Sequence, residues 1–326
     1  MAGAHGGLGW RSGHAPAHGR GGSQAGRGCL CAWYSASRAG PAIAGAGRGP
    51  RVNEVLNAFT VDLEDWYQGL EIGPEQWSGF ASRLRVGSER LLRLLDAASA
   101  RATFFVLGYA AEQDPDLIRE IRARGHEIGT HGYAHRLVYR LDPEEFKRDI
   151  ERSLDILTGL VDTPIHTHRA PFFSITRQSE WAFDILAECG LRSDSSVFPV
   201  RNYRYGIADA PRWRYQVRPQ LAEFPLATYR LGRRNIPVGG GAYFRIFPYT
   251  LTRYALRAIN AEGGGAVFYI HPWELDPDHP RLDLPRRIGL THYWNLAATE
   301  RRLERLLGDF RFVPLGCLMQ QEDRTH

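Results

Sequence analysis

The sequence is short of lysine and cysteine, and it has no long apolar run. Lys147 is its sole lysine, so arginine carries nearly all of the positive charge. The four cysteines in 326 residues form no pattern typical of a disulfide-rich scaffold, which favours a reducing compartment. No stretch approaches the ~20 apolar residues that span a bilayer. The basic residues near the N-terminus are not followed by an apolar run of about seven or more residues, as they would be in a secretory signal. We therefore expect a cytoplasmic protein with no membrane span.

The first 50 residues contain no Asp, Glu or Lys, although they contain five arginines. Those five equal the formal net charge of +5, the difference between 41 basic and 36 acidic residues, so the remainder is electrically balanced. A nucleic-acid partner is therefore not expected. The segment is rich in Gly, Ala and Arg without apolar periodicity, and we expect it to be disordered. Our hypothesis is that it is upstream sequence read as protein, with the true start near Val52, which N-terminal sequencing of the natural product can test.

From residue 55 onward, short apolar runs alternate with amphipathic stretches. The apolar runs predict strands over residues 56–61, 103–107, 126–128, 165–168, 193–197, 266–270 and 310–315. Helical spacing of apolar residues predicts helices over residues 87–99, 116–124, 142–158, 180–189, 249–260 and 299–307. This alternation predicts an α/β fold with a parallel sheet closed, or nearly closed, into a barrel. Residues 202–241 break the rhythm and are expected to form a loop or hairpin insertion, with a flexible turn at 239–241.

His131 and His135 are the first candidate metal ligands, since they follow the strand expected at 126–128. Two histidines four residues apart would lie on one side of a helical turn, where both can reach a single ion. A metalloprotease of this kind needs a Glu directly after the first histidine, and Gly132 stands there, so that class is excluded. His126 lies within the strand and is expected to be structural.

Three carboxylates follow the first predicted strand in the string Thr-Val-Asp-Leu-Glu-Asp. Crowded acids raise one another's pKa, which suits one of them as a base and another as a metal ligand. Alternation along a strand puts Asp62 and Glu64 on one side and Asp65 on the other. Two imidazoles and one carboxylate leave an open position on a divalent metal, as in catalytic rather than structural sites.

Three further candidate residues follow two of the predicted strands. Arg169 follows the 165–168 strand and can hold a carboxylate ionised and oriented. The proline before Phe172 has no N–H, so the Phe172 N–H is the next one available to an oxyanion. His271 ends the 266–270 strand and is a candidate general acid. His166 and His168 are expected to be packing or turn histidines.

Taken together, these motifs resemble the polysaccharide deacetylase family (NodB homology, carbohydrate esterase family 4-like) in order and spacing. The strings are Thr-Val-Asp-Leu-Glu-Asp, His-Gly-Tyr-Ala-His, Arg-Ala-Pro-Phe and Ile-His-Pro-Trp-Glu. The resemblance covers about residues 55–318 and is nearest to the branch associated with exopolysaccharide and exosortase (PEP-CTERM) gene clusters. That branch has a C-terminal extension, which matches Pro-Val-Gly-Gly-Gly-Ala-Tyr-Phe-Arg and His-Tyr-Trp-Asn here. We therefore expect one catalytic domain over residues 51–326, with the extension at about 237–326.

The resemblance implies a distorted (β/α)7-type barrel that binds one divalent metal, most often Zn²⁺. It implies that Asp62 is the base, His131 and His135 are metal ligands, Arg169 orients the base, the Phe172 N–H stabilises the oxyanion and His271 is the general acid. Leu63 replaces the second acid of the usual first motif, so Glu64 is the expected carboxylate ligand, with Asp65 as the fallback. Gly132 stands where the family usually has a hydroxyl residue.

Some assignments stay open at the level of sequence. The residue that supports the acid histidine is one of Asp194, Trp213, Glu223 and Glu274. The aromatic residues that could stack on sugars are Tyr133, Phe173, Trp273, Tyr293 and Trp294.

The expected function is metal-dependent removal of N-acetyl groups from a polysaccharide, such as a bacterial exopolysaccharide. The partner would be an N-acetylated glycan. One alternative is hydrolysis of a small cyclic amide, as in allantoinase-like relatives, and another is a non-catalytic carbohydrate-binding relative. A long open groove would favour the polymer, and a closed pocket would favour the small molecule.

Overall fold

The structure, a computed structural model, describes residues 55–70, 72–202 and 204–322. The disorder expected for residues 1–50, and the proposed start near Val52, lie outside this part of the chain. Within the described residues, no helix is both long and apolar enough to cross a membrane.

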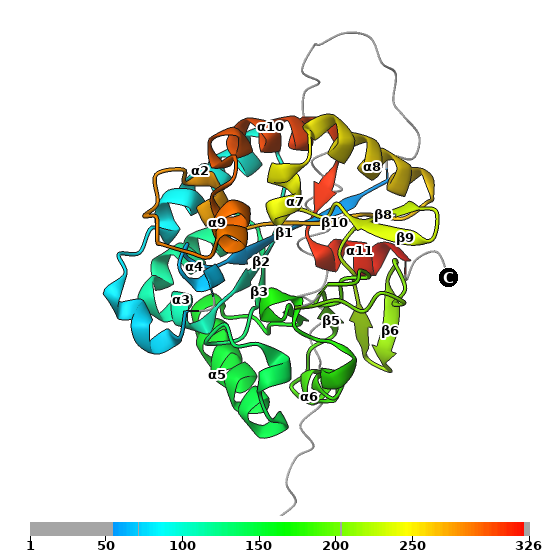
Figure 1. Ribbon diagram of the computed structural model, residues 1–326. Helices are drawn as coiled ribbons and strands as arrows, with labels where there is room; N and C mark the ends of the chain where they lie inside the picture. The colour runs from blue at the N-terminus through cyan, green and yellow to red at the C-terminus, as the bar shows by residue number, and fades with distance from the viewer. Residues whose placement is uncertain (1–54, 71, 203, 323–326) are drawn as a thin grey trace, which may run out of the picture. The chain divides into compact units, whose positions relative to one another are not determined.

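A mainly parallel sheet of nine strands forms the centre of the described residues (Figure 1). Its order is β10-β1-β2-β3-β4-β5-β7-β6, with β11 beside β1, and only the β6–β7 pair is antiparallel. The strands are β1 (Asn57–Leu63), β2 (Thr103–Val106), β3 (Glu127–Thr130), β4 (Thr167–His168), β5 (Ser193–Asp194), β6 (Tyr215–Arg218), β7 (Leu221–Glu223), β10 (Val267–Ile270) and β11 (Phe312–Val313).

The sheet curls toward closure between β7 and β10. The Ala227 N–H donates to Val267 O at 3.1 Å, and Gly240 forms an isolated parallel bridge with Tyr269. Gly240 has φ +130°, and a Cβ there would lie 1.8 Å from Tyr269 O, so only glycine allows this approach. The expected distorted (β/α)7-type barrel is confirmed: seven parallel strands follow one another from β10 to β7, and backbone contacts rather than a full ladder close the gap.

Helices cover the sheet, and two of them, α4 (Pro115–Ala123) and α5 (Pro143–Val161), begin at an aspartate whose side chain caps the helix. In α5, the Asp142 carboxylate accepts from the Glu145 N–H at 2.7 Å and Glu145 reaches back, which is a capping box ahead of a proline-started helix. The helices are α2 (Leu84–Ala97), α3 (Gly108–Gln113), α4 (Pro115–Ala123), α5 (Pro143–Val161), α6 (Ala182–Glu188), α7 (Gly241–Ile246), α8 (Tyr249–Ala261), α9 (Arg286–Tyr293), α10 (Thr299–Asp309) and α11 (Leu315–Glu322). Short 3-10 turns include η3 (Gln68–Leu70), η4 (Pro74–Gly79), η5 (Val138–Arg140), η6 (Pro171–Phe173), η7 (Arg177–Ser179), η8 (Pro272–Leu275) and η9 (Leu296–Ala298).

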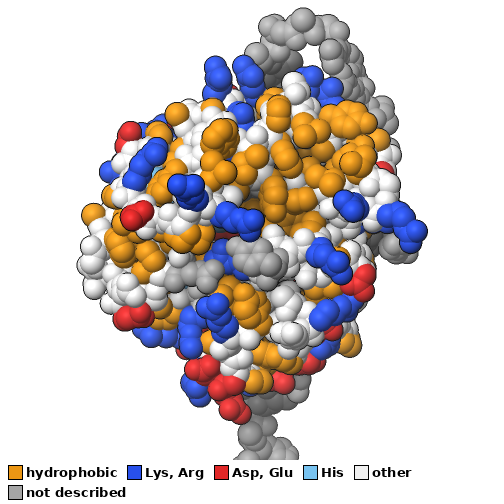
Figure 2. All heavy atoms as spheres, in the orientation of Figure 1, with side chains coloured by type: hydrophobic (Ala, Val, Ile, Leu, Met, Phe, Trp, Pro, Cys, Tyr) orange, Lys and Arg blue, Asp and Glu red, His pale blue; other side chains and the backbone are white. Residues whose placement is uncertain are grey.

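The main core lies between the sheet and the α2, α4, α8 and α10 helices. It includes Phe59, Leu91, Phe104, Leu256 and Phe268, each fully buried. Burial of such a side chain contributes about 1.5–3 kcal/mol, so this layer fixes β1 at the centre of the molecule. On the face shown in Figure 2, basic and acidic side chains are interspersed around hydrophobic areas.

The structure corrects three expectations outside the site. The hairpin expected within residues 202–241 is present as β8 (Thr228–Leu231) and β9 (Arg234–Pro237), besides β6 and β7, but the glycines at 239–241 form a sheet bridge and start α7 rather than a flexible turn. The predicted 310–315 strand shrinks to β11, because Pro314 has no N–H for a ladder and α11 begins at the next residue. Cys317 is disulfide-bonded, which removes the cysteine argument for a reducing compartment.

Candidate metal centre and active site

Strand β1 delivers two carboxylates toward the same side. Every residue of β1 is buried, and Asp62 and Glu64 both line one cavity of about 460 Å³. Asp65 turns away: its carboxylate accepts from Ser82 Oγ at 2.5 Å and from the N–H groups of Trp66 and Arg83 at 2.9 and 3.1 Å. Asp65 is therefore occupied in fixing the turn after β1, whereas Glu64 faces the histidines.

The two histidines come from a left-handed turn and not from a helix. Gly132 has φ +74° and His135 has φ +52°, so the expected helical turn is wrong. The reason is that the turn's N–H groups bond to a side chain: Asp149 of α5 accepts from the N–H of Tyr133 at 2.7 Å and of Ala134 at 3.3 Å. This turn still brings the two imidazole centroids within 5.2 Å of each other.

Gly132 departs from the usual family pattern for a local steric reason. A Cβ at this position would lie 2.7 Å from the Asp149 carboxylate that holds the turn. We expect Gly132→Ala to destabilise the fold by about 1–3 kcal/mol through left-handed strain and this clash, and to weaken metal binding. Thermal melts and metal titration measure both effects. Gly190→Ala is the matched control, because Gly190 has φ +81° and a Cβ added there would meet no atom of the described residues within 4 Å. Equal metal binding by both variants would contradict the steric explanation.

Glu64, His131 and His135 form a three-residue cluster with the geometry of a metal site. One donor atom from each lies within 4.8 Å of the other two, and all three residues are buried. Glu64 Oε2 lies 2.6 Å from His135 Nε2, although this oxygen has no partner with hydrogen-bond geometry among the described residues. A carboxylate oxygen and an imidazole nitrogen that lie this close without a hydrogen bond between them are placed as two ligands of one cation would be.

The protonation states also fit a cation. His131 Nδ1–H donates to the Arg169 carbonyl at 2.7 Å, which leaves Nε2 as the free lone pair. Burial lowers the pKa of His131 to about 4, so the ring is neutral, as a ligand must be. Burial opposes ionisation of Glu64, but His135 and His271 outweigh it and hold the pKa of this carboxyl well below its usual value. The donor set therefore suits a divalent metal with an open position.

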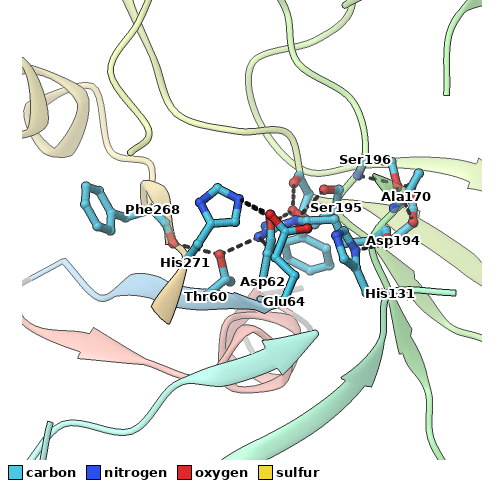
Figure 3. Close-up of polar contacts among 12 residues, drawn as sticks. Thr60, Asp62, Glu64, His131, Ala170, Asp194, Ser195, Ser196, Phe268 and His271 are labelled. Atoms are coloured by element: carbon cyan, nitrogen blue, oxygen red, sulfur yellow. Dashed lines mark hydrogen bonds and ion pairs between the residues drawn. The ribbon is translucent and has the colours of Figure 1, made fainter. Parts of the chain in front are cut away.

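Arg169 is fully buried and fixes Asp62, which lies beside Thr60 and Glu64 in Figure 3. Its Nη1 donates to Asp62 Oδ1 and to Thr60 Oγ1, each at 2.7 Å. Its other nitrogens donate to the carbonyl and the hydroxyl of Ser195 at 2.9 and 2.8 Å. With both ends held, the guanidinium keeps the Asp62 carboxylate in one orientation.

Phe172 lies at a strained turn on the cavity wall. Phe172 and Phe173 have φ values of +54° and +53°, a conformation that costs about 1–3 kcal/mol each for non-glycine residues. The Phe172 ring packs on His135 with centroids 4.5 Å apart. Strain of this kind is concentrated at functional sites, which is consistent with the role expected for the Phe172 N–H.

Glu274 is the residue that supports His271. The His271 Nδ1–H donates to Glu274 Oε1 at 2.7 Å, and His271 Nε2 points toward Glu64 and Asp62 at 3.4 and 3.9 Å. Burial alone would lower the pKa of His271, but Glu64, Glu274 and Asp62 outweigh it and raise that pKa to about 9.

Sequence reasoning missed Arg245, which completes this arrangement from α7. Its Nε donates to Glu274 Oε2 at 2.5 Å, and its other nitrogens donate to the backbone carbonyls at positions 291, 292 and 294. Burial opposes ionisation of Glu274, yet Arg245 and His271 outweigh it and hold the pKa of that carboxyl below its usual value. The only sequence signal was the position of Arg245 at the end of the Gly-Gly-Gly-Ala-Tyr-Phe-Arg string.

The remaining candidates for that support lie elsewhere. Asp194 accepts from His168 Nδ1 at 2.6 Å, and burial together with Asp194 raises the pKa of Glu223 well above its usual value. Ser196 donates to Asp194 and accepts from the Ala170 N–H at 2.8 Å, so this buried cluster holds the loop after Arg169. Trp213 packs near Gly264, and His166 is exposed.

The aromatic candidates divide by position. Phe173 and Trp273 line the 460 Å³ cavity, and Trp273 stacks between His271 and His292 with centroids 5.2 and 4.2 Å away. The Tyr133 ring is covered by a guanidinium 3.5 Å away, and the Tyr293 hydroxyl accepts from the Leu282 N–H. Trp294 is half exposed beside a second cavity.

Two family models match adjacent parts of the chain. Residues 77–193 match the polysaccharide deacetylase model, and residues 195–320 match a domain of unknown function, DUF3473. The chain is 32% identical over 94 residues to a peptidoglycan-N-acetylglucosamine deacetylase of Bacillus cereus, covering 28% of this chain and 34% of that protein. It is 29% identical over 106 residues to a chitooligosaccharide deacetylase of Rhizobium leguminosarum, covering 32% of this chain and 46% of that protein. The chain thus spans less than half of each of these two curated relatives.

A solved structure from Mycobacterium smegmatis, provisionally assigned as a polysaccharide deacetylase, has the same fold. It superposes with a TM-score of 0.56 at 22% identity, over 84% of this chain and 92% of the other. The likeness extends well beyond the curated sequence matches, so the barrel and its C-terminal part form a shared architecture.

Proposed function

We propose that the protein hydrolyses N-acetyl groups on a glycan with the help of one divalent metal, since residues 77–193 match the polysaccharide deacetylase model. The observation that carries this proposal is the cluster of Glu64, His131 and His135 beside Asp62 in one cavity. A carbohydrate-binding relative without activity would need no such set of base, acid and ligands.

Glu64, His131 and His135 would hold the metal, and two imidazoles with one carboxylate are a donor set that suits Zn²⁺. When bound, such an ion lowers the pKa of a coordinated water and polarises the acetyl carbonyl.

The other residues would move and hold protons. Asp62, oriented by Arg169, accepts the proton of the attacking water. The Phe172 N–H donates to the developing oxyanion, a contact worth several kcal/mol at a preorganised site. His271, oriented by Glu274, donates a proton to the amine nitrogen as the C–N bond breaks.

We further propose that the catalytic domain runs over residues 51–326, including the extension at 237–326. The cavity is lined by residues from before, within and after the segment 77–193. Its rim carries the exposed side chains of Ile246 and Leu290, which favours an extended glycan over a small cyclic amide. An exopolysaccharide as the substrate stays a prediction.

Acetate release from N-acetylated chitooligosaccharides tests the function directly. We expect the purified protein to contain about one divalent ion per chain, to lose its activity on treatment with a chelator and to regain it with Zn²⁺. An active enzyme with no stoichiometric metal, or one indifferent to the chelator, would overturn the proposed mechanism.

The pH profile should report the support given to His271. This histidine acts as an acid, so activity falls as pH rises through its pKa, which negative neighbours raise. Glu274→Gln removes one of those charges, so we expect the alkaline fall in kcat/KM to occur at a pH about one to two units lower. Glu75→Gln, at an exposed site, should leave the profile unchanged. An unshifted limb in Glu274→Gln would mean that another group sets it.

A further inference from the structure

Three large hydrophobic side chains are exposed together next to the proposed active site. Ile246 ends α7, Leu290 belongs to α9 and Trp294 follows α9, with exposed fractions of 42%, 56% and 49%. Figure 2 shows hydrophobic side chains gathered on this face over the region of α7 and α8. A grouped apolar surface at the mouth of a cavity is a common feature of binding sites.

A second cavity of about 410 Å³ lies under Trp294. Its walls are Ile246, Pro248, Trp294, Asn295 and Arg302. Ile246 also lines the 460 Å³ cavity that contains the metal cluster, as does Leu290 one helical turn before Trp294. The two cavities therefore share a wall, and a molecule too long for the first would extend over Ile246 into the second.

Trp294 is exposed on a firmly held backbone. Its N–H donates to Leu290 O at 3.0 Å, and its carbonyl accepts from the buried Arg245 at 2.8 Å. The next residue, Asn295, donates to Arg245 O at 3.1 Å. Arg302 donates to three carbonyls at the end of α7 and fixes the floor of the cavity. The exposed indole is thus a preorganised surface rather than part of a loose loop.

The shape and chemistry of this cavity suit a sugar ring. Small-molecule sites commonly have volumes of about 300–1,000 Å³ with mostly apolar walls and a few polar groups. A pyranose has an apolar face of C–H groups and a polar rim, which match an exposed indole beside an amide and a guanidinium.

We propose that this second cavity binds a sugar unit of the substrate chain beyond the unit that is deacetylated, with Trp294 stacked on its pyranose face. The proposal rests on the proposed function. It assigns to the protein a glycan of several units as substrate, and it gives the region matched by DUF3473 a role in holding that chain.

Chitooligosaccharides of two to six units test the subsite. We expect Trp294→Ala to raise KM for the hexamer about tenfold with kcat unchanged, and to leave the dimer unaffected. Trp294→Phe should recover most of the loss. Tyr254→Ala is the control, because Tyr254 is a 59% exposed aromatic residue on α8 that lines neither cavity.

Equal KM values for the hexamer in the wild type and Trp294→Ala, or an equal loss at every length, would overturn the subsite while the proposed function stands. If the wild type releases no acetate from any length, the proposed function fails for these glycans, and calorimetric binding of the hexamer decides the subsite. Weaker binding by Trp294→Ala supports the subsite, and unchanged or absent binding overturns it.

Discussion

Glu64→Gln is expected to lower metal affinity and acetate release by more than about 100-fold. Even residues that only orient metal ligands change affinity by about 10–100-fold, and a direct carboxylate ligand contributes more. The amide keeps the size of the side chain but loses the charge that His135 and His271 face at 2.6 and 3.4 Å. Metal content after gel filtration and acetate release measure the two effects.

Asp65→Asn is the matched control for that experiment. It removes one negative charge from the adjacent residue, yet Asp65 bonds to Ser82 and Arg83 and not to the histidines. We expect it to retain its metal and most of its activity. Metal loss in Asp65→Asn with retention in Glu64→Gln would reverse the assignment of the ligand.

Asp62→Asn should lower kcat by about 10²–10⁴-fold while the metal stays bound. The amide cannot accept a proton, and general-base catalysis contributes a factor of this size. The ligands Glu64, His131 and His135 are untouched, so metal content and stoichiometry should match the wild type. Single-turnover acetate release, with metal analysis of the same sample, measures both quantities.

Asp62→Asn removes the proposed base and also the charged partner of Arg169, so a control has to separate these two effects. Arg169 is fully buried, and an unpaired buried charge costs about 3–5 kcal/mol, so a thermal melt accompanies the kinetics. Thr60→Val removes the other acceptor of the same Arg169 nitrogen and leaves the base in place. We expect it to lose less than about tenfold in kcat. A folded Asp62→Asn that retains kcat within tenfold of the wild type would exclude Asp62 as the base.

The periodicity of the sequence was sufficient to predict where side chains point when a single strand determines their geometry. The twofold alternation of a strand put Asp62 and Glu64 on one side and Asp65 on the other, and the structure has them so. The buried β1, β2 and β10 strands were also visible as apolar runs, because parallel strands with both faces covered contain few polar residues.

Periodicity was insufficient to predict the backbone of a turn or the partner of a side chain when contacts with a distant part of the chain determine them. The spacing of His131 and His135 suggested a helix, but Asp149 on α5 captures the N–H groups of the turn and a non-glycine residue takes φ +52°. Arg245 reaches Glu274 from another helix, so no local pattern connects them. The pairing of His271 with Glu274 did have a local sign, since a cap residue, Pro and then Glu at the third position is the pattern of a capping box.

The position of β1 between β2 and β10 sets an order of events during synthesis. Thr60 on β1 bonds to Phe268, 208 residues later, whereas the partners on β2 and the histidine turn follow β1 within the first half of the chain. Between residues 135 and 271 the ribosome adds 136 residues, which takes roughly ten seconds at ordinary rates. The nascent chain therefore possesses all three proposed metal ligands before the proposed proton donor, His271, is synthesised, with one edge of β1 still open. Under the proposed function, the residues that would hold the ion are complete long before the residue that would complete catalysis.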